Sequence, residues 1–240
     1  PYLSNISAYE PIYFLVGTDP AQSKFQISLK YRLFGDENQM ARKHSWVSGI
    51  HFGYTQTSFW DLASDSAPFE DTSYKPELLY MTKNIRQKPD WMHALFVQFG
   101  ARHESNGRAG NESRSTNTIY LQPVFVFYKP TTRIGLGVFP RVWLYAENDD
   151  DTNADLQDYR GYCELTLKVG KADGFVLGTK LGFAEQGASV QADLTFPLSQ
   201  RLSSSAGIYL QVQYVDTLAE SLLDYRDRTQ AFRLGFALVR

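Results

Sequence analysis

Hydrophobic and polar residues alternate along most of the chain. The clearest case is the segment 132–146, where every second residue is apolar: Ile134, Leu136, Val138, Pro140, Val142 and Leu144. Successive side chains of a β-strand point to opposite faces, whereas an amphipathic helix repeats about every 3.6 residues. No long segment follows the helical period. The pattern therefore predicts an all-β chain.

Twelve segments carry this strand pattern. They are residues 9–17, 24–34, 44–58, 73–83, 92–104, 115–128, 132–146, 159–170, 173–184, 187–197, 202–215 and 228–239. An even number of strands allows an antiparallel sheet to close on itself. Because no linker-like stretch separates the segments, we expect residues 1–240 to form a single domain.

A soluble β-sandwich would show the same alternation, so the lengths of the links matter. From the third segment onward, longer links at 59–72, 105–114, 147–158 and 216–227 alternate with shorter ones at 84–91, 129–131, 171–172 and 198–201, and the short 185–186 link is an exception. Long loops at one rim and short turns at the other are typical of outer-membrane barrels. The expected fold is a twelve-stranded antiparallel transmembrane β-barrel.

Composition narrows the class of protein further. The formal net charge is −2, and Lys and Arg are scattered, which argues against a nucleic-acid partner. The lone Cys163 cannot form a disulfide within the chain. No run of about 18 apolar residues marks a membrane-spanning helix. The 15 Tyr and 16 Phe residues suit the aromatic bands of a membrane barrel.

Three polar residues interrupt the apolar face of two neighbouring segments. The apolar phase of segment 92–104 is Leu95, Val97, Phe99 and Ala101, and it continues to His103 and Ser105. In segment 115–128 the apolar phase is that of Asn117, followed by Ile119, Leu121, Pro123, Phe125 and Phe127. Unpaired polar groups facing hydrocarbon are costly, so we expect these three side chains to be partners of one another.

A serine, a histidine and an asparagine in contact have the parts of a hydrolytic triad. Ser105 would be the nucleophile, His103 the base, and Asn117 the group that holds the other ring nitrogen of the histidine. A neutral amide can fix the imidazole tautomer, but it stabilises an imidazolium less than a carboxylate does. The alternative is that His103 and Ser105 are rim residues bonded to backbone.

The segment HESNGRAGNESRSTN, residues 103–117, closely resembles the active-site stretch of the bacterial outer membrane phospholipase A family. Further similarity lies in YTQTSFWDL (54–62), APFEDTSYKPEL (67–78), YRGYCELTLKVG (159–170) and ESLLDYRDRTQ (220–230). The resemblance implies a calcium-dependent phospholipase A1/A2. Such an enzyme hydrolyses acyl esters of phospholipids and lysophospholipids and is an integral protein of the bacterial outer membrane. It is active as a calcium-promoted homodimer.

The resemblance also implies roles for individual residues. Ser105, His103 and Asn117 take the triad positions. The family's calcium positions correspond to Arg108 and Ser113 of one chain with Ser66 of its partner. Its dimer-interface glutamine corresponds to Gln56. Gln56 has the phase of the apolar positions Trp46, Ile50, Phe52 and Tyr54, so the pattern independently places an amide on an apolar face. Glu104 lies between the outward His103 and Ser105, so it is expected to point inward.

Two other functions fit a membrane barrel. A passive channel needs an open charged lumen, and a rim-site outer-membrane protease needs acidic pairs and a histidine. The expected inward residues are of both signs and could pair across a narrow bore: Arg141, Glu164, Lys168, Lys180, Asp193, Gln211, Gln213 and Arg233. The acidic run Glu147, Asn148, Asp149, Asp150 and Asp151 is interpreted as a solvated loop rather than a metal site.

Overall fold

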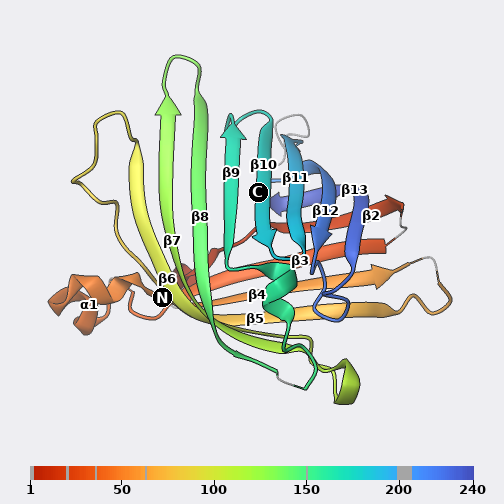
Figure 1. The fold of residues 1–240 in the computed structure, drawn as a ribbon. Coiled ribbons are helices and arrows are strands. Elements are labelled where there is room, and N and C mark those ends of the chain that lie inside the picture. The colour runs from red at the N-terminus through yellow and green to blue at the C-terminus, as the bar shows by residue number, and fades with distance from the viewer. Residues whose placement is uncertain (1–2, 20–21, 36, 63, 150, 199–206) are drawn as a thin grey trace.

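The computed structural model of the chain is a closed antiparallel β-barrel (Figure 1). It describes residues 3–19, 22–35, 37–62, 64–149, 151–198 and 207–240. The strands are β1 (Ile6–Ala8), β2 (Ile12–Asp19), β3 (Gln22–Arg32), β4 (Ile50–Asp61), β5 (Phe69–Met81), β6 (Ala94–Ser105), β7 (Ser115–Lys129), β8 (Ile134–Asn148), β9 (Cys163–Gly170), β10 (Val176–Ala184), β11 (Gly187–Pro197), β12 (Tyr209–Leu218) and β13 (Arg228–Val239).

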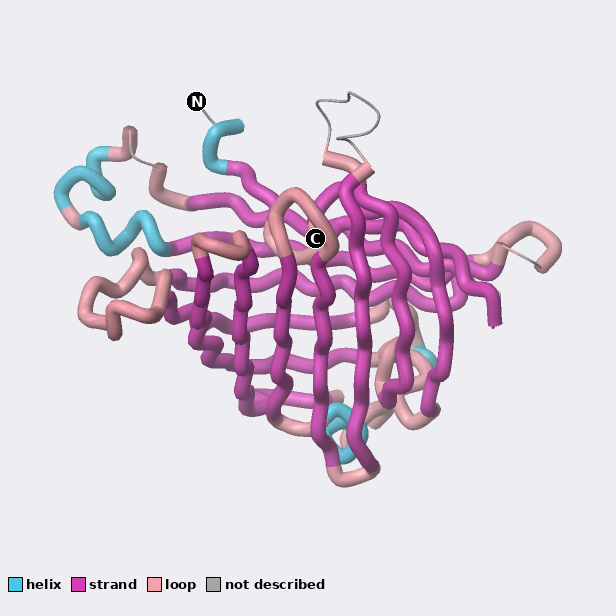
Figure 2. Tube along the Cα trace, turned by 90° about the horizontal axis from the view of Figure 1, so that it is seen from above, coloured by secondary structure: helices cyan, strands magenta, loops and turns pink. Residues whose placement is uncertain are grey.

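Every strand from β2 onward pairs with its neighbours in sequence, and β13 pairs with β2 to close the ring. The short β1 pairs with β3 beside β2 and adds no wall of its own. The other twelve strands confirm the predicted barrel. Strands β7–β10 cross β3–β5 of the opposite wall at a steep angle in Figure 1, as strand tilt in a barrel requires. Figure 2, seen from above, likewise shows one set of strands crossing another behind it.

The distribution of apolar side chains is inverted relative to a water-soluble domain. Large hydrophobic side chains lie exposed on the outer wall, among them Ile119 at 60% exposure, Leu144 at 71% and Phe236 at 55%. Fully buried side chains inside include Arg233 and Gln213. A wall that is apolar outside and polar inside is what a lipid environment requires of a barrel. The predicted outward phase of β8 is confirmed, since Ile134, Leu136, Val142 and Leu144 are exposed.

Several strand limits differ from the predicted ones. Residues 45–49, expected in the third strand, form a 3-10 helix, η2 (Ser45–Gly49), and β4 begins at Ile50. Trp46 therefore does not share the strand phase of Gln56, and that part of the prediction is wrong. Short helices also occur at η1 (Leu3–Asn5), α1 (Gln39–Lys43), η3 (Gly110–Glu112) and α2 (Leu156–Arg160). The start of the expected strand 202–215 falls on residues 202–206, outside the described part of the chain.

The two rims differ less in loop length than the sequence suggested. One rim carries the links 62–68, 106–114, 149–162, 185–186 and 219–227, and the other carries 33–49, 82–93, 130–133, 171–175 and 198–208. The 59–72 loop is shorter than expected because β4 and β5 run further into it. The 84–91 link is longer than expected, since β5 ends at Met81 and β6 begins only at Ala94.

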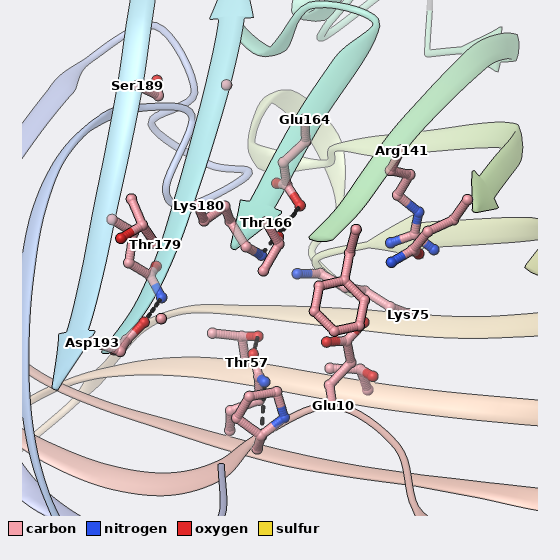
Figure 3. Close-up of a pocket in the computed structure, with 18 of the residues that line it drawn as sticks. Glu10, Thr57, Lys75, Arg141, Glu164, Thr166, Thr179, Lys180, Ser189 and Asp193 are labelled. Atoms are coloured by element: carbon pink, nitrogen blue, oxygen red, sulfur yellow. Dashed lines mark hydrogen bonds and ion pairs between the residues drawn. The ribbon is translucent and has the colours of Figure 1, made fainter. Parts of the chain in front are cut away.

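Paired charges and amides occupy the lumen, as predicted (Figure 3). Lys180 lies 3.6 Å from Glu164, and Arg141 lies 3.8 Å from the buried Glu77. Gln211 and Gln213 both donate hydrogen bonds to Asp193. Around these groups is a cavity of about 590 Å³. Most of these pairs join adjacent strands, so they line and narrow the bore around the cavity.

Glu104 points into the lumen, as expected from its phase. Its carboxylate accepts a hydrogen bond from Ser73 and one of 2.8 Å from Arg160 of α2. The neighbouring residues His103 and Ser105 consequently face outward. Within the described residues, the helices are too short and too polar to cross a membrane.

Candidate active site

His103 and Asn117 are directly opposite each other on β6 and β7, and Ser105 is opposite Ser115. The Nδ1 atom of His103 lies 2.8 Å from Oδ1 of Asn117. An amide oxygen only accepts, so Nδ1 carries the proton and donates it, and in the neutral imidazole Nε2 is then the unprotonated nitrogen. The expectation that the outward polar residues are partners is confirmed for this pair. Ser105 stands one pleat further along the same face of β6.

The loop after Ser105 is organised by the buried Asn106. Its amide oxygen accepts hydrogen bonds from the backbone N–H of Arg108, at 3.3 Å, and of Arg114, at 3.0 Å. Its amide nitrogen donates to the carbonyl of Glu112 at 2.9 Å. Gly107 follows with φ of 70°, a conformation that favours glycine, and a Cβ there would meet the Tyr74 ring at 3.0 Å. The segment Ser105–Asn106–Gly107 therefore sets the end of β6 rigidly.

Arg108 connects this loop to the start of β5. Its guanidinium donates to the backbone carbonyl of Glu70, lies 3.8 Å from the buried carboxylate of Asp71, and bonds Glu112 at 2.5 Å. Asp71 in turn accepts the backbone N–H groups of Leu222 and Leu223 in the β12–β13 loop. The side chain of Arg108 thus holds the β6–β7 loop to the start of β5.

Gln56 and Ser105 lie in one row across the outer wall. Register pairs Gln56 of β4 with Tyr74 of β5, and Tyr74 with Ser105 of β6. Gln56 accepts a 3.0 Å hydrogen bond from Tyr54 and donates one of 3.2 Å to Ser58. This confirms that Gln56 is an outward amide on a mainly apolar wall. The row places the expected interface residue two strands from the expected nucleophile.

The expected calcium residues lie on the rim that carries the triad. Ser113 lies near the end of the β6–β7 loop, where its carbonyl accepts a 2.8 Å hydrogen bond from the side chain of its neighbour Arg114. Ser66 is exposed in the β4–β5 loop with φ of 66°. Serine hydroxyls and backbone carbonyls are the hard oxygen donors that calcium takes, but it needs about six to eight of them. Two residues of one chain fit part of such a site, and water or a second chain must supply the rest. Among the described residues, no cluster of three or more His, Cys, Asp or Glu side chains is placed to hold a metal.

Above this rim, the β8–β9 and β12–β13 loops hold each other through Asp155. Arg226 donates to its carboxylate at 2.9 Å, and Tyr225 also donates to it. The hydrogen bond from Arg226 is the main cause that lowers the pKa of Asp155. Burial, with the hydrogen bond to Asp155, raises the pKa of Tyr225 to about 12. Leu156, Ala219, Leu222 and Tyr225 form a small apolar core beneath these contacts.

One residue of the site was missed in the sequence. Glu147, assigned to a solvated acidic loop, lies in β8 instead, one residue before its end, and its Oε2 accepts a 3.3 Å hydrogen bond from Nδ2 of Asn117. The run of acids at a strand end was the available signal. Strict alternation from the outward Leu144 predicts that Glu147 points inward, so the pattern argued against a place for Glu147 beside Asn117.

The sequence profile of the phospholipase A1 family matches residues 5–238. The chain belongs to the phospholipase A1 family. A phospholipase A1 relative from Neisseria meningitidis serogroup B is 31% identical over 224 residues, which cover 90% of this chain. The chain spans about half of that relative, 54% of its length.

Solved structures of outer membrane phospholipases share the fold of this family member. The Salmonella typhi enzyme, crystallised as a dimer with bound calcium, superposes with a TM-score of 0.76 at 24% identity, covering 97% of this chain and 92% of the other. An Escherichia coli active-site mutant, in which an asparagine is replaced by alanine, gives the same TM-score and identity, with 97% and 91% covered. At this identity the likeness shows the barrel fold.

Proposed function

We propose that the chain is an integral outer-membrane phospholipase that hydrolyses acyl esters of phospholipids and lysophospholipids. The observation that carries the proposal is the 2.8 Å contact between His103 and Asn117 on the outer wall, one pleat from Ser105. A base oriented by a neighbour and close to a hydroxyl is the arrangement that activates a serine. The wall around it would face acyl chains, the substrate's own surroundings. Membership of the phospholipase A1 family supports the same reaction.

The chemistry follows from the protonation of His103. Nε2 accepts the Ser105 hydroxyl proton as Oγ attacks the ester carbonyl, and the same nitrogen then returns the proton to the departing lysophospholipid oxygen. The resulting acyl-serine is hydrolysed when Nε2 takes a proton from water and gives it back to Ser105. Throughout, Nδ1–H donates to Asn117, which keeps the ring in position. A backbone N–H near Ser105 would stabilise the oxyanion.

We further propose calcium as the cofactor, held by backbone and hydroxyl oxygens of Arg108 and Ser113 with Ser66 of a second chain. When bound, calcium would supply positive charge to the oxyanion. The Salmonella typhi relative is a dimer with bound calcium, which supports the proposal. A convex barrel wall has no groove for an acyl chain, so a second copy beside Gln56 would also complete the substrate cleft.

The lumen argues against a passive channel. Tyr9 enters it from the segment before β2, and its hydroxyl accepts a 2.6 Å hydrogen bond from Gln98. Glu10 lies 4.0 Å from Arg102, which is paired with Glu77 at 2.7 Å. Side chains bonded to one another narrow the bore where a channel needs an open path. A rim protease is disfavoured because the His103 side chain faces the outer wall rather than the rim opening.

Release of fatty acid from a defined phospholipid in detergent tests the function directly. We expect hydrolysis at both acyl positions and of lysophospholipid, and we expect chelation of calcium to stop it. Failure of the refolded chain to release fatty acid at any calcium concentration would contradict the proposal.

Membrane insertion can be tested on β11. Leu194 is 42% exposed on the outer wall, so Leu194→Arg should destabilise the barrel in bilayers by ~2–4 kcal/mol. Gln191→Arg is the matched control, because residue 191 lies inside beside Asp193. Urea titration of the protein folded in lipid vesicles, followed by tryptophan fluorescence, measures both. Equal tolerance at the two positions would show that the outer wall does not face lipid.

Calcium binding and dimerisation should strengthen each other. If two chains share each ion, calcium must strengthen dimerisation by the factor by which dimerisation strengthens calcium binding. We expect Ser66→Ala to weaken both together, and Gln56→Ala to weaken mainly the dimer, by an interfacial hydrogen bond of ~0.6–2 kcal/mol. High calcium should partly rescue Gln56→Ala. Analytical ultracentrifugation in detergent across a calcium titration measures this, and a dimer that forms equally well in chelator would refute the coupling.

A further inference from the structure

The β7–β8 ladder contains a bulge beside the proposed triad. Thr118 pairs with Tyr145, but the next residue, Asn117, pairs with Glu147, so Ala146 is an extra residue in β8. In a regular ladder Ala146 would be opposite Asn117. Glu147 would then follow Tyr145 to the inner face, because side chains alternate. The bulge shifts the phase by one residue and brings Glu147 to the outer face.

The shift completes a row of three side chains on three adjacent strands. Register aligns His103 of β6, Asn117 of β7 and Glu147 of β8. Nδ1 of His103 lies 2.8 Å from Oδ1 of Asn117, and Nδ2 of Asn117 lies 3.3 Å from Oε2 of Glu147. One amide thus bridges the imidazole and a carboxylate.

We propose that Glu147 is a positioning residue for the hydrolysis, acting on His103 through the amide of Asn117. The inference rests on the proposed function and deepens it. A terminal amide has two orientations, one presenting oxygen and one presenting NH₂ to the imidazole. An ionised carboxylate only accepts hydrogen bonds, so it holds the NH₂ group on the β8 side. Oδ1 then faces Nδ1–H of His103, and Nε2 is left as the base for Ser105.

The carboxylate also supplies charge. Proton transfer from Ser105 makes His103 an imidazolium, which a neutral asparagine stabilises less than an aspartate would. Glu147 provides that negative charge one side chain away, and it polarises the amide so that Oδ1 becomes a stronger acceptor. An asparagine in contact with a glutamate therefore combines the orienting and the electrostatic roles that one carboxylate has in a Ser-His-Asp triad.

Other charged groups near His103 are already engaged or lie elsewhere. Arg102 and Glu104, its neighbours on β6, point into the lumen and pair with Glu77 and Arg160. In the β6–β7 loop, Arg108 pairs with Glu112, and Arg114 lies over the Tyr225 ring. On β5, the adjoining outward residue is Tyr74. The carboxylate joined to the triad by hydrogen bonds is that of Glu147.

The first test compares Glu147→Gln with Asp151→Asn, which removes the same charge from the loop that follows. Loss of a charge-assisted hydrogen bond from a catalytic network should lower kcat roughly 10- to 100-fold for Glu147→Gln with little change in KM. Asp151→Asn should stay within about twofold of the parent. In an Asn117→Ala background, Glu147→Gln should have no further effect, because the connection is already cut. An equal loss in both backgrounds would overturn the proposal.

A swap of the two groups separates positioning from mere structural support. Asn117→Asp alone would put two carboxylates in contact, and this variant is expected to hydrolyse phospholipid slowly. Adding Glu147→Gln should restore activity, because the glutamine amide can donate to the new aspartate and the total charge returns to that of the parent. A double variant no faster than Asn117→Asp alone would overturn the proposal.

A third measurement does not depend on lipid hydrolysis. In the Ser105→Ala protein in detergent, the ring ¹⁵N chemical shifts of His103 report which nitrogen carries the proton. We expect a protonated Nδ1 when Glu147 is present, and a mixture of the two tautomers after Glu147→Gln, because the Asn117 amide is then free to turn. An unchanged tautomer would overturn the role of Glu147 even if the parent is a phospholipase. A parent without phospholipase activity whose tautomer still depends on Glu147 would instead refute the proposed function and leave the Glu147–Asn117–His103 connection intact.

Discussion

Replacing Ser105 by alanine is expected to remove nearly all fatty-acid release, by roughly 10³-fold or more, while the barrel stays folded. The hydroxyl would carry the reaction, whereas the backbone of residue 105 supplies the pairing with Tyr74 and Ser115. Fatty-acid release by His103→Ala should fall as far, because neither the nucleophile nor the base is effective without the other. The double variant should be no slower than either single one, which is the behaviour of a catalytic unit.

Initial rates on a phospholipid in mixed micelles with calcium, compared at equal amounts of folded protein, measure this. Heat-modified mobility in a detergent gel reports the folding of each variant. Asn117→Ala is the graded companion, since it leaves Ser105 and His103 in place and removes only the group that holds Nδ1. We expect a smaller loss than for Ser105→Ala. Turnover near that of the parent for Ser105→Ala or His103→Ala would refute the triad.

The barrel and the outward face of the site could be predicted because both follow from a period of two. The phase that places Ile119 and Phe99 on the outer wall also places Asn117 and His103 there, and no tertiary detail is needed to extend it. The contact between His103 and Asn117 then follows from the adjacency of consecutive strands in an antiparallel barrel. The same reasoning placed Glu104 in the lumen and Gln56 on the wall.

The parts that could not be predicted are those where the period breaks. Residues 45–49 carry apolar residues that suit a strand, yet they form η2, whose Val47 is buried. The bulge at Ala146 changes which residue of β8 faces Asn117, and nothing in the local alternation marks it. Register shifts arise from how two strands fit, so one strand read alone cannot reveal them. Glu147 was missed for this reason.

The dimer could not be predicted from the alternation along one chain. Phase shows that Gln56 faces outward, but a partner is a property of two surfaces. Within one chain, the Gln56 side chain bonds Tyr54 and Ser58 of its own strand. The alternation along that strand therefore cannot identify the surface that would cover Gln56.

Replacing Glu220 by alanine is expected to destabilise the barrel by about 3–5 kcal/mol, because it leaves buried cations without their counterion. Glu220, in the β12–β13 loop, bonds Lys24 of β3 at 2.9 Å and the fully buried Arg233 of β13 at 2.7 Å. All three side chains are at most 6% exposed. The carboxylate therefore joins two strands that lie on either side of β2, where the barrel closes.

Asp173→Ala is the matched control, since Asp173 pairs with Arg133, whose side chain is 65% exposed, and an exposed pair contributes about 1 kcal/mol or less. Urea unfolding in vesicles at neutral pH should separate the two variants clearly. Acid should reproduce the effect in the parent. Burial alone would raise the pKa of Glu220, but Lys24 and Arg233 beside it bring that pKa below its usual value. Its contribution is thus complete above the ordinary glutamate pKa of about 4.5 and is lost as the pH falls through the lower folded value. The Glu220→Ala barrel should consequently lose less stability than the parent on acidification, and equal losses would show that this carboxylate does not stabilise the barrel closure.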